Sequence, residues 1–510
     1  MTKNILALII VIHSVLIGDM HPLFLMQPLL HFRTTRKLYF LVRRLIDVDL
    51  AKYKEMLRKA YEVALMLKKQ EEVLVVTHVD ADGITSGSIA LQALERAGIE
   101  GNILFVKQLD PSTIEQVADR NVFTWFTDLG SGQLDLIAEK KIECVITDHH
   151  VPQGHYRLQL NPNDFGVDGA HELGGAPTTY LVAKSMGLNY DLVSLAIVGA
   201  VGDLQDSRHG KLIGLNRLVL QEGVEGNFIS AFRDLRLFGK QTRPVYKMLE
   251  YTFDPYLPGI SGNEKAALEL LESLGISPKD GEFWRRWIDL SYEEKVALTS
   301  ELVKLCMEAG YPVSTIKRLV GETYIMLHEE EGTELRDAME YSTLLNATAR
   351  YGHEDVGLKV CLGDRGEALR RARTLLQNHR RNLSEGLKLV DEIGIVELDN
   401  IQYFHAEDKI LDTIVGIVAG MCFSKANLRK PIIAFANNSE GVKVSARATQ
   451  RLVEMGVHLA NALRIAAEKV GGKGGGHSIA AGALIPAGCE KEFLRELDRI
   501  IGGQLAKCRS

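Results

Sequence analysis

The pattern of hydrophobic and polar positions after Glu71 alternates between two periods. Short apolar runs of strand length are separated by longer stretches in which apolar residues recur at helical spacing. This alternation predicts βαβ units around a mostly parallel sheet. The apolar segment Leu192–Val201 closes this first domain. The predicted strands are Val73–Val76, Ile103–Val106, Val122–Phe126 and Cys144–Ile146, and the clearest helices between them are Ile84–Ala97 and Leu134–Lys140.

The pattern changes twice more along the chain. Residues 218–340 are dominated by long polar and charged helical stretches, which predict a mainly helical insert. From Leu344 the α/β character returns, with helices predicted over Glu367–Leu389 and Gln450–Val470 and a glycine-rich segment at Gly471–Gly476. We therefore predict an α/β protein with a parallel-sheet domain (45–217), a mainly helical insert (218–340) and a smaller α/β domain (341–510).

The first 44 residues do not fit this organisation. Asn4–Gly18 is an apolar run, but it is shorter than the about 20 residues that a membrane-spanning helix needs. We interpret residues 1–44 as an apolar extension from a misassigned translation start, with a membrane anchor as the competing interpretation. An amphipathic helix over Leu45–Gln70 leads into the first strand. We therefore expect no stable membrane association, and activity without residues 1–44.

Composition narrows the function classes. The 510-residue chain is 46% hydrophobic, which is enough for several cores, and its net charge of −6 excludes a molecule coated in positive charge. Contact with nucleic acid would therefore need a local basic groove. The six cysteines are far apart and form no CxxC pair, which indicates a reducing, cytoplasmic setting and argues against a zinc–cysteine site.

Carboxylates and imidazoles gather where predicted strands end. His78, Asp80 and Asp82 follow the first apolar run, and alternation along an extended segment would point all three to one side, with Gly83 allowing a tight turn. The next strand-ends deliver Asp128 and then Asp148-His149-His150, and the apolar segment ending at Gly202 delivers Asp203. The carboxyl edge of such a sheet is where ligands bind.

This group of side chains predicts a metal centre. A single Asp after a strand is usually a helix cap or a turn former, so Asp128 or Asp203 alone would be structural. Several converging carboxylates repel one another unless a cation neutralises them. Mixed Asp and His ligands suit Mn²⁺ or Mg²⁺, with the imidazoles favouring Mn²⁺. Two such ions suit phosphodiester hydrolysis.

The complete set of motifs resembles the DHH phosphoesterase family, in particular its RecJ-like members. Four segments carry the resemblance in the first domain: His78–Gly83, Thr127–Gly130, Thr147–His150 and Gly199–Asp203. Leu345–Ala347 with Arg350 looks like the RecJ linker motif, and Val444–Arg447 and Gly474–His477 look like the DHH-associated substrate domain. The resemblance covers roughly residues 45–510 and implies a two-metal hydrolase.

The resemblance also implies roles for individual residues. One cation would be held by His78, Asp80 and Asp128, and the other by Asp82, Asp128, His149 and Asp203, so that Asp128 bridges them. His150 would contact the scissile phosphate, and Asp148 would orient its neighbours. The substrate-binding residues implied by the family are Asn346, Arg350, Ser445, Arg447, Gly475, Gly476 and His477.

Within the family, the length and the insert look most like the archaeal GINS-associated nucleases. That likeness implies a single-stranded-DNA exonuclease, with 5′ to 3′ polarity, that acts in replication or repair and binds the GINS complex. Two alternatives stay open. One is a phosphodiesterase of short oligoribonucleotides or cyclic dinucleotides, and the other is a non-catalytic replication scaffold, which the complete ligand set disfavours.

Three further features have two interpretations each. The glycine run could form an anion-binding nest or a flexible turn, and Arg447 could add a phosphate fork. The arginines of Glu367–Leu389 could form a solvated helix face or a groove for a nucleic-acid backbone. Trp284 and Trp287 in the insert are interpreted as core or partner contacts and not as base-stacking platforms.

Overall fold

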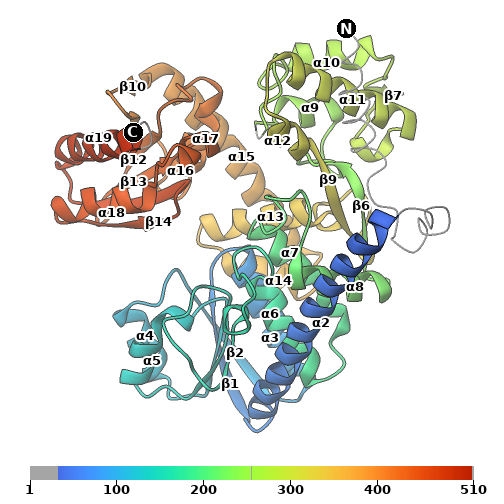
Figure 1. The fold of residues 1–510 in the computed structure, drawn as a ribbon, viewed down its shortest axis with the longest axis vertical. Helices are drawn as coiled ribbons and strands as arrows, with labels where there is room; N and C mark the ends of the chain where they lie inside the picture. Colours follow the sequence, from blue (N-terminus) through green and yellow to red (C-terminus); the bar gives the residue numbers. More distant parts are fainter. Residues whose placement is uncertain (1–32, 254, 508–510) are drawn as a thin grey trace. The chain divides into compact units, whose positions relative to one another are not determined.

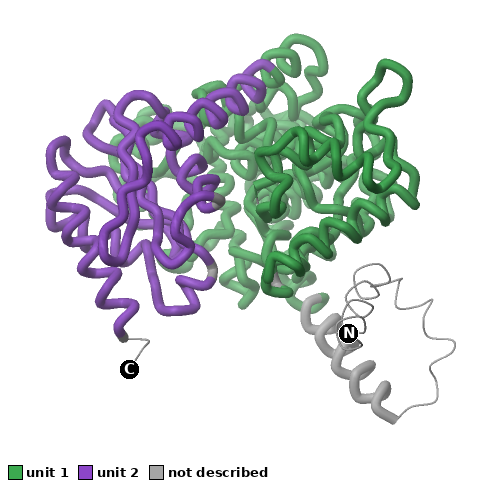
Figure 2. Tube along the Cα trace, turned by 90° about the horizontal axis from the view of Figure 1, so that it is seen from above, with its two compact units in different colours: residues 1–373 green, residues 374–510 purple. Residues whose placement is uncertain are grey.

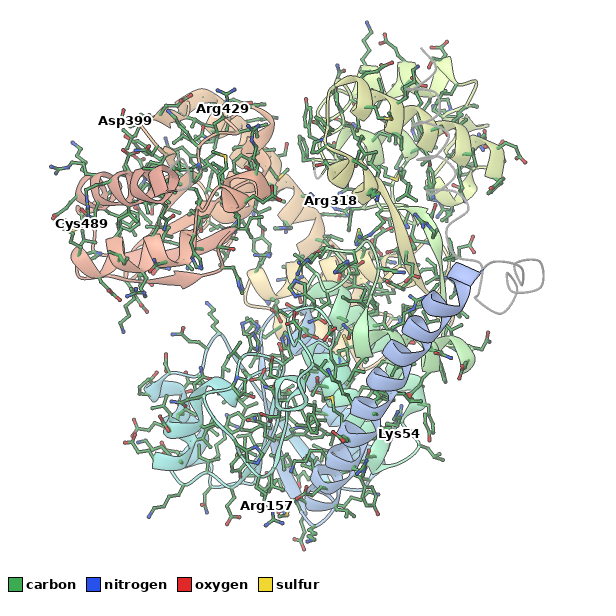
Figure 3. All side chains as sticks on the ribbon, viewed as in Figure 1. Lys54, Arg157, Arg318, Asp399, Arg429 and Cys489 are labelled. Carbon is green, nitrogen blue, oxygen red and sulfur yellow. The ribbon has the colours of Figure 1, made fainter. Side chains whose placement is uncertain are left out.

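The computed structural model describes residues 33–253 and 255–507, so most of the predicted extension 1–44 lies outside the described residues. The chain divides into two compact units, one ending at Arg373 and the other beginning at Thr374 (Figure 2). Within the described part, no helix has the length and apolarity to cross a membrane. The described cysteines are free thiols, four of them buried and Cys489 partly exposed in the second unit (Figure 3).

A five-stranded parallel sheet forms the centre of the first unit, with strand order β2-β1-β3-β4-β5. This confirms the predicted α/β class. The central strands are buried on both faces, as expected for a parallel sheet covered by helices. The strands are β1 (Glu72–His78), β2 (Glu100–Val106), β3 (Thr124–Thr127), β4 (Cys144–Thr147) and β5 (Gln159–Leu160).

Helices cover both faces of this sheet (Figure 1). Leu74 and Val76 pack on one side with apolar residues of α4 (Pro111–Asp119) and α5 (Leu134–Glu139). The other side is covered by α3 (Ala81–Arg96), α6 (Gly175–Met186) and α7 (Val193–Gly202), with α2 (Arg33–Leu67) against α6. The helices α8 (Gly214–Glu225), α13 (Ala338–Arg350) and α14 (Glu354–Cys361) complete the unit.

The insert is carried on an antiparallel ribbon that the sequence pattern did not predict. β6 (Ile229–Leu235) pairs with β9 (Val320–Met326), with Leu235 opposite Val320. Between them lie α9 (Val245–Glu250), α10 (Glu264–Ser273), the hairpin β7–β8 (Lys279–Asp280 and Phe283–Trp284), α11 (Tyr292–Glu308) and α12 (Val313–Ile316).

The insert has its own hydrophobic core, in which Trp287 is 1% exposed. The Trp287 indole Nε1 lies 3.0 Å from a carboxylate oxygen of Asp234, to which it donates a hydrogen bond. Trp284, by contrast, is 39% exposed and packs on Tyr246. Of the two tryptophans, Trp287 is therefore a core residue and Trp284 lies at the surface.

The second unit is a six-stranded mixed sheet with helices on both faces, in the order β10-β11-β12-β13-β15-β14. β11 and β12 are parallel, and the other neighbours are antiparallel. The strands are β10 (Val396–Glu397), β11 (Gln402–His405), β12 (Ile432–Asn438), β13 (Gly441–Arg447), β14 (Lys473–Gly476) and β15 (Ala480–Ile485). The helices are α15 (Glu367–Ile393), which begins before Thr374, α16 (Val415–Met421), α17 (Gln450–Glu454), α18 (Leu459–Lys469) and α19 (Glu490–Lys507).

Two local predictions for this unit were wrong. The glycine run is not a flexible turn along its whole length, because its residues from Lys473 form β14 at the sheet edge, paired with β15. The single helix predicted over Gln450–Val470 is two helices, because the chain breaks at Gly456, whose φ of +90° is outside the helical region. His458 then caps α18 through its ring Nδ1, which accepts from the Asn461 amide.

Candidate metal centre

The first motif bends from strand to helix within a few residues. β1 ends at His78, and Asp80 is the N-cap of α3, accepting from the Gly83 amide at 3.0 Å. Asp82 therefore reaches the site from the first turn of α3, and the prediction of one extended segment for all three ligands was wrong. Gly83 is required by the close approach, since a Cβ there would lie 2.1 Å from the His78 carbonyl oxygen.

Asp128 directly follows β3 in a left-handed conformation, with φ of +61°. Its side chain is 2% exposed and lies against the start of α6, where a Cβ on Gly175 would be 2.4 Å from Asp128 Oδ1. His149 follows β4 in the neighbouring position of the sheet. Asp203, in contrast, follows the end of the helix α7 and not a strand.

The side chains predicted as metal ligands converge. His78 Nδ1 lies 3.0 Å from Asp80 Oδ2 and 4.0 Å from Asp128 Oδ2. His149 Nε2 lies 3.2 Å from Asp128 Oδ1 and 3.8 Å from Asp82 Oδ2. Three groups have ligand atoms within 4.8 Å of one another and could each hold a metal ion: His78, Asp80 and Asp128; Asp82, His149 and Asp203; and Asp128, Asp148, His149 and His150.

The carboxylates of this cluster are buried and repel one another, so binding of a cation would stabilise their charged forms. Loss of hydration raises the pKa of Asp82, and the neighbouring Asp128 charge raises it further. The same loss of hydration raises the pKa of Asp128 itself, against the opposing effect of His149. Burial opposes protonation of His149, but its close contact with Asp128 and the nearby carboxylates outweigh this and raise its pKa. Bound protons thus neutralise the cluster in the metal-free protein, and cations would compete with them for the same groups.

The geometry of His149 and Asp128 provides a test of whether a cation fits. His149 Nδ1 lies 2.7 Å from the Gly169 carbonyl oxygen, so the neutral ring must donate from Nδ1 and present the Nε2 lone pair. That lone pair faces Asp128 Oδ1, a buried oxygen whose contact with the ring does not have hydrogen-bond geometry. Two acceptors facing each other require a proton or a cation between them. The oxygen and imidazole donors suit Mn²⁺ or Mg²⁺.

Asp148 has a different role from the other acids. Its Oδ1 accepts from the His149 and His150 amides, at 2.7 and 3.1 Å, and lies 2.8 Å from His150 Nδ1. Its Oδ2 accepts from the Ser131 amide at 3.0 Å. Burial opposes ionisation, but the His150 hydrogen bond and charge keep the pKa of Asp148 well below its usual range. These contacts hold the Asp148 carboxylate against the backbone of Ser131, His149 and His150.

His150 is held at the surface of the cluster. Its side chain is 61% exposed, and the hydrogen bond to Asp148 raises its pKa. Asn161 and Asn163 donate to the His150 carbonyl oxygen at 2.9 and 3.2 Å and fix the backbone there. Sequence reasoning missed both asparagines, although the Asn161-Pro-Asn163 turn after an apolar segment could have indicated them.

Asn346 and Arg350, predicted to bind substrate, lie on α13 beside the first motif. Asn346 Oδ1 accepts from the Ala81 amide at 3.0 Å. Burial lowers the pKa of the Arg350 guanidinium, and the Asp80 charge opposes this, so Arg350 lies within the electrostatic reach of the cluster. The structure thus brings both residues beside the cluster of carboxylates and imidazoles in the first unit.

The remaining predicted substrate residues gather in the second unit. Ser445 on β13 and Gly475 on β14 are both opposite Gly482 of β15, so the three lie in one row across the sheet. Arg447 lies two residues beyond Ser445, and a Cβ on Gly416 would be 2.6 Å from Arg447 Nη2. Gly476 ends β14, and the amide of His477 donates to the Ala480 carbonyl oxygen at 2.8 Å.

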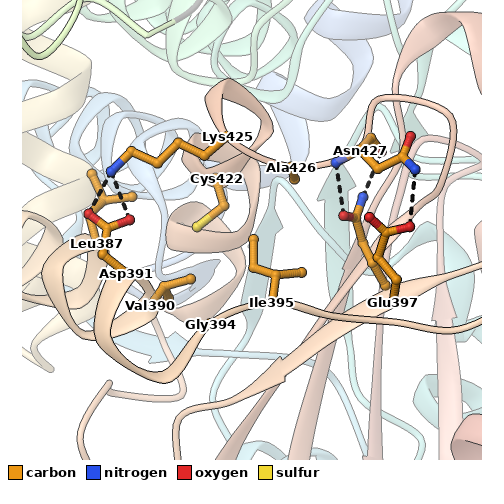
Figure 4. A pocket seen from close by; sticks show the side chains of 11 residues that line it. Leu387, Val390, Asp391, Gly394, Ile395, Glu397, Cys422, Lys425, Ala426 and Asn427 are labelled. Carbon is orange, nitrogen blue, oxygen red and sulfur yellow. Dashed lines mark hydrogen bonds and ion pairs between the residues drawn. The ribbon is translucent and has the colours of Figure 1, made fainter.

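A cavity of about 270 Å³ also lies in the second unit (Figure 4). Its charged groups are engaged with one another, since Lys425 Nζ lies 2.5 Å from Asp391 Oδ2. Asn427 donates to Glu397 at 3.1 Å. Burial raises the pKa of the lining thiol Cys422 to about 12, which makes it a poor nucleophile. The cavity carries no chemistry comparable to the acidic cluster.

Family models match all three parts of the chain. The N-terminal domain of the DHH family matches residues 72–198, the DHH-CID domain matches 237–320 and the DHHA1 domain matches 400–503. The DHH-CID match falls between β6 and β9, which is the segment carried on the ribbon. An uncharacterized protein of Methanocaldococcus jannaschii is 32% identical over 445 residues, covering 85% of this chain and 94% of that protein.

Solved structures share the fold at low sequence identity. CDC45 from Entamoeba histolytica has a TM-score of 0.60 at 13% identity, covering 89% of this chain and 98% of that one. RecJ from Thermus thermophilus in complex with Mn²⁺ has a TM-score of 0.54 at 16% identity, covering 87% of this chain but only 55% of that one. The exonuclease RecJ bound to manganese has a TM-score of 0.53 at 17% identity, covering 87% and 94%.

The sheet, its acidic carboxyl edge and the family matches define the class of protein. The chain belongs to the DHH family. Its fold is RecJ-like, as the resemblance of its motifs predicted.

The stability of the metal-free protein is expected to depend on pH. The pKa values of Asp82, Asp128 and His149 are raised in the folded state. At a pH above the ordinary pKa values of these groups, the folded state therefore binds more protons than the unfolded state. Stability of the metal-free protein should therefore fall as pH rises from about 6 to about 8. The lowered pKa of Asp148 affects stability only below about pH 4, so it does not change the expected fall in stability between pH 6 and pH 8.

Mn²⁺ competes with these protons, so its stabilising effect should increase over the same pH range. Thermal unfolding with Mn²⁺ or EDTA at the two pH values measures the effect. We expect a larger difference in melting temperature at the higher pH. An equal or larger difference at the lower pH would contradict the proposed competition.

Proposed function

We propose that this protein is a two-metal phosphodiesterase that digests single-stranded DNA from the 5′ end, in DNA replication or repair. The observation that carries the proposal is the convergence of His78, Asp80 and His149 on the buried Asp128. His78 and Asp80 lie near one carboxylate oxygen of Asp128, and His149 lies near the other. That arrangement suits a carboxylate that bridges two cations.

The proposed ligand sets follow from these groups. His78, Asp80 and Asp128 would hold one cation, and Asp82, Asp128, His149 and Asp203 the other. Bound divalent cations supply charge neutralisation and Lewis acidity for attack of water on a phosphodiester. Mn²⁺ is the proposed ion and Mg²⁺ the alternative, since the imidazole ligands favour Mn²⁺ and a RecJ of similar fold was solved with manganese.

The chain's own residues would position the substrate. Asp148 holds Nδ1 of the His150 ring and raises the pKa of His150, and the doubly protonated ring would donate from Nε2 to a phosphate oxygen. Arg350 would add charge on the same side of the site. We assign Ser445, Arg447 and the β14 residues Gly475 and Gly476, with His477, to binding of the substrate backbone in the second unit.

The insert is proposed as the surface for a replication partner, specifically the GINS complex. Its own core and its placement on a two-stranded ribbon make it a separate body within the first unit, with none of the proposed ligands. The similarity of fold to CDC45 supports a replication setting. The free thiols of the described cysteines support a reducing, cytoplasmic location.

Digestion of end-labelled oligonucleotides tests the proposed function. Single-stranded DNA and RNA carrying a label at either end would be incubated with Mn²⁺, Mg²⁺ or EDTA. We expect immediate release of the 5′ label from DNA as mononucleotides with Mn²⁺, slower release with Mg²⁺, and none with EDTA. Preference for RNA of a few nucleotides would favour the short-oligonucleotide alternative, and no hydrolysis with any ion would favour the scaffold.

A further inference from the structure

A fully buried glutamine connects two of the proposed metal ligands. Gln205 is 0% exposed and follows Asp203 by two residues. Its Nε2 donates to Asp203 Oδ2 at 3.0 Å and to the Gly169 carbonyl oxygen at 2.8 Å. A primary amide has two N–H donors, so one side chain can serve both acceptors at once.

The Gly169 carbonyl oxygen that accepts from Gln205 is also the atom that sets the tautomer of His149. His149 Nδ1 lies 2.7 Å from it, and this contact leaves Nε2 facing Asp82 and Asp128. Gly169 approaches so closely that a Cβ there would lie 1.8 Å from the His149 carbonyl oxygen. The position of this carbonyl therefore determines which way the His149 ring is turned.

The orientation of the Gln205 amide is itself set by a neighbour. Asn216, also 0% exposed, donates from Nδ2 to Gln205 Oε1, 2.5 Å away. Asn216 Oδ1 in turn accepts from the Gly174 amide at 3.4 Å. If Gln205 were flipped, its oxygen would face the Asp203 and Gly169 oxygens and its nitrogen would face a donor. Both amides are thus held in one orientation.

We infer that Gln205 is a positioning residue for one of the two metal sites, fixing Asp203 directly and His149 through Gly169. The inference rests on the proposed function, because it assumes that these ligands hold a cation. It concerns one ion only. No hydrogen bond joins Gln205 to His78 or Asp80 among the described contacts, so the other ion should bind independently of it.

Calorimetric titration of the full chain with Mn²⁺ tests this inference. Gln205→Met keeps the side-chain volume and removes the hydrogen bonds. We expect one of two binding events to weaken by about tenfold to a hundredfold, as for loss of other partners that support metal ligands. The other event should be unchanged. The Mn²⁺ concentration for half-maximal hydrolysis should rise by the same factor, and saturating Mn²⁺ should restore the rate, which a general folding defect would not allow.

Gln402→Met is the matched control. Gln402 is 1% exposed, and its Nε2 donates to the Asn427 and Lys430 carbonyl oxygens at 2.7 and 2.9 Å, in the second unit. The Gln402→Met variant loses equivalent hydrogen bonds, but its Mn²⁺ affinity should equal that of the wild type. If Gln205→Met does not fold, Gln205→Asn serves instead, because its shorter side chain cannot reach both acceptors and should weaken the same event.

The outcomes separate this inference from the proposed function. If wild type binds two Mn²⁺ ions and a folded Gln205 variant binds both with unchanged affinity, the positioning role is wrong and the metal centre stands. Equal weakening of both events, or equal weakening in Gln402→Met, would also overturn the role. If wild type binds no Mn²⁺, the proposed function itself fails.

Discussion

Asp128→Asn is expected to lower hydrolysis by more than about 100-fold, a larger loss than the tenfold to hundredfold that removal of a ligand's supporting partner costs. The reason is its position, because one carboxylate oxygen lies near His78 and the other near His149. Asparagine keeps only one oxygen, so one proposed cation loses its ligand atom from this side chain and both lose the negative charge between them. The rate of digestion of a labelled single strand, measured over a range of Mn²⁺ concentrations, gives the result.

The same variant should not be less stable than wild type without metal. Loss of hydration raises the pKa of Asp128, so its charge opposes folding and a neutral amide relieves that cost. Thermal unfolding in EDTA checks this expectation. A variant that is inactive because it is unfolded would not test the bridging role, whereas a folded variant with near wild-type activity would contradict it.

Asp206→Asn is the matched control for this experiment. Asp206 is also 2% exposed, but it pairs with Arg236 at 2.5 Å outside the ligand groups. Burial raises the pKa of Asp206 as it does that of Asp128, so a neutral amide should be tolerated at both positions in the metal-free protein. Hydrolysis by the folded fraction should be retained. The two variants thus should differ in activity while both remain folded.

Excision of the insert should abolish association with GINS while leaving hydrolysis of short single strands. The β6–β9 ribbon sets the boundaries of the deletion. The Arg236 amide donates to the Leu319 carbonyl oxygen at 2.7 Å, so the two chain segments lie side by side at the end of the ribbon. We would replace residues 244–318 by a flexible linker of about eight Gly and Ser residues, which spans up to roughly 28 Å.

This boundary keeps the root of the insert intact. Lys240, Gln241 and Thr242 remain, and the last two hydrogen-bond the buried Glu340 of α13. Burial, with the nearby Asp337 charge, raises the pKa of Glu340 to about 7, so exposing it without those partners would confuse the result. A pull-down with purified GINS compares the excised protein with wild type and with Asp128→Asn, which should still bind.

Retained GINS binding by the folded, excised protein would place the partner surface outside residues 244–318. Loss of hydrolysis by that protein would show that the insert is needed for catalysis. Neither outcome is expected, because all the proposed ligands come from elements outside the ribbon.

The convergence of the proposed metal ligands could be predicted because each follows a local signal in the sequence. Asp128 and His149 come within two residues of the ends of buried strands that lie side by side in a parallel sheet, so local patterns and a general rule of topology bring them together. Asp203 was found for a different reason than expected, since it follows the helix α7. A uniformly apolar segment of that length has the same appearance as a buried strand or a buried helix.

Structural features that depend on contacts between residues far apart in the sequence could not be predicted. β6 and β9 pair across the whole insert, and neither has a strong alternation of its own. The glycine run forms a strand because β15 pairs with it, although glycine alone disfavours strands. Gln205 looked like any polar residue after a helix, and only its contacts with Gly169 and Asp203 distinguish it.

The central claim is that this cluster holds two divalent cations, and anomalous diffraction from crystals grown with Mn²⁺ tests it most directly. We predict two peaks on either side of the Asp128 carboxylate, separated by roughly 3.5–4 Å as in other two-metal hydrolases. One peak should lie beside His78 and Asp80, and the other beside His149 and Asp203. A single peak, or none at Asp128, would contradict the account.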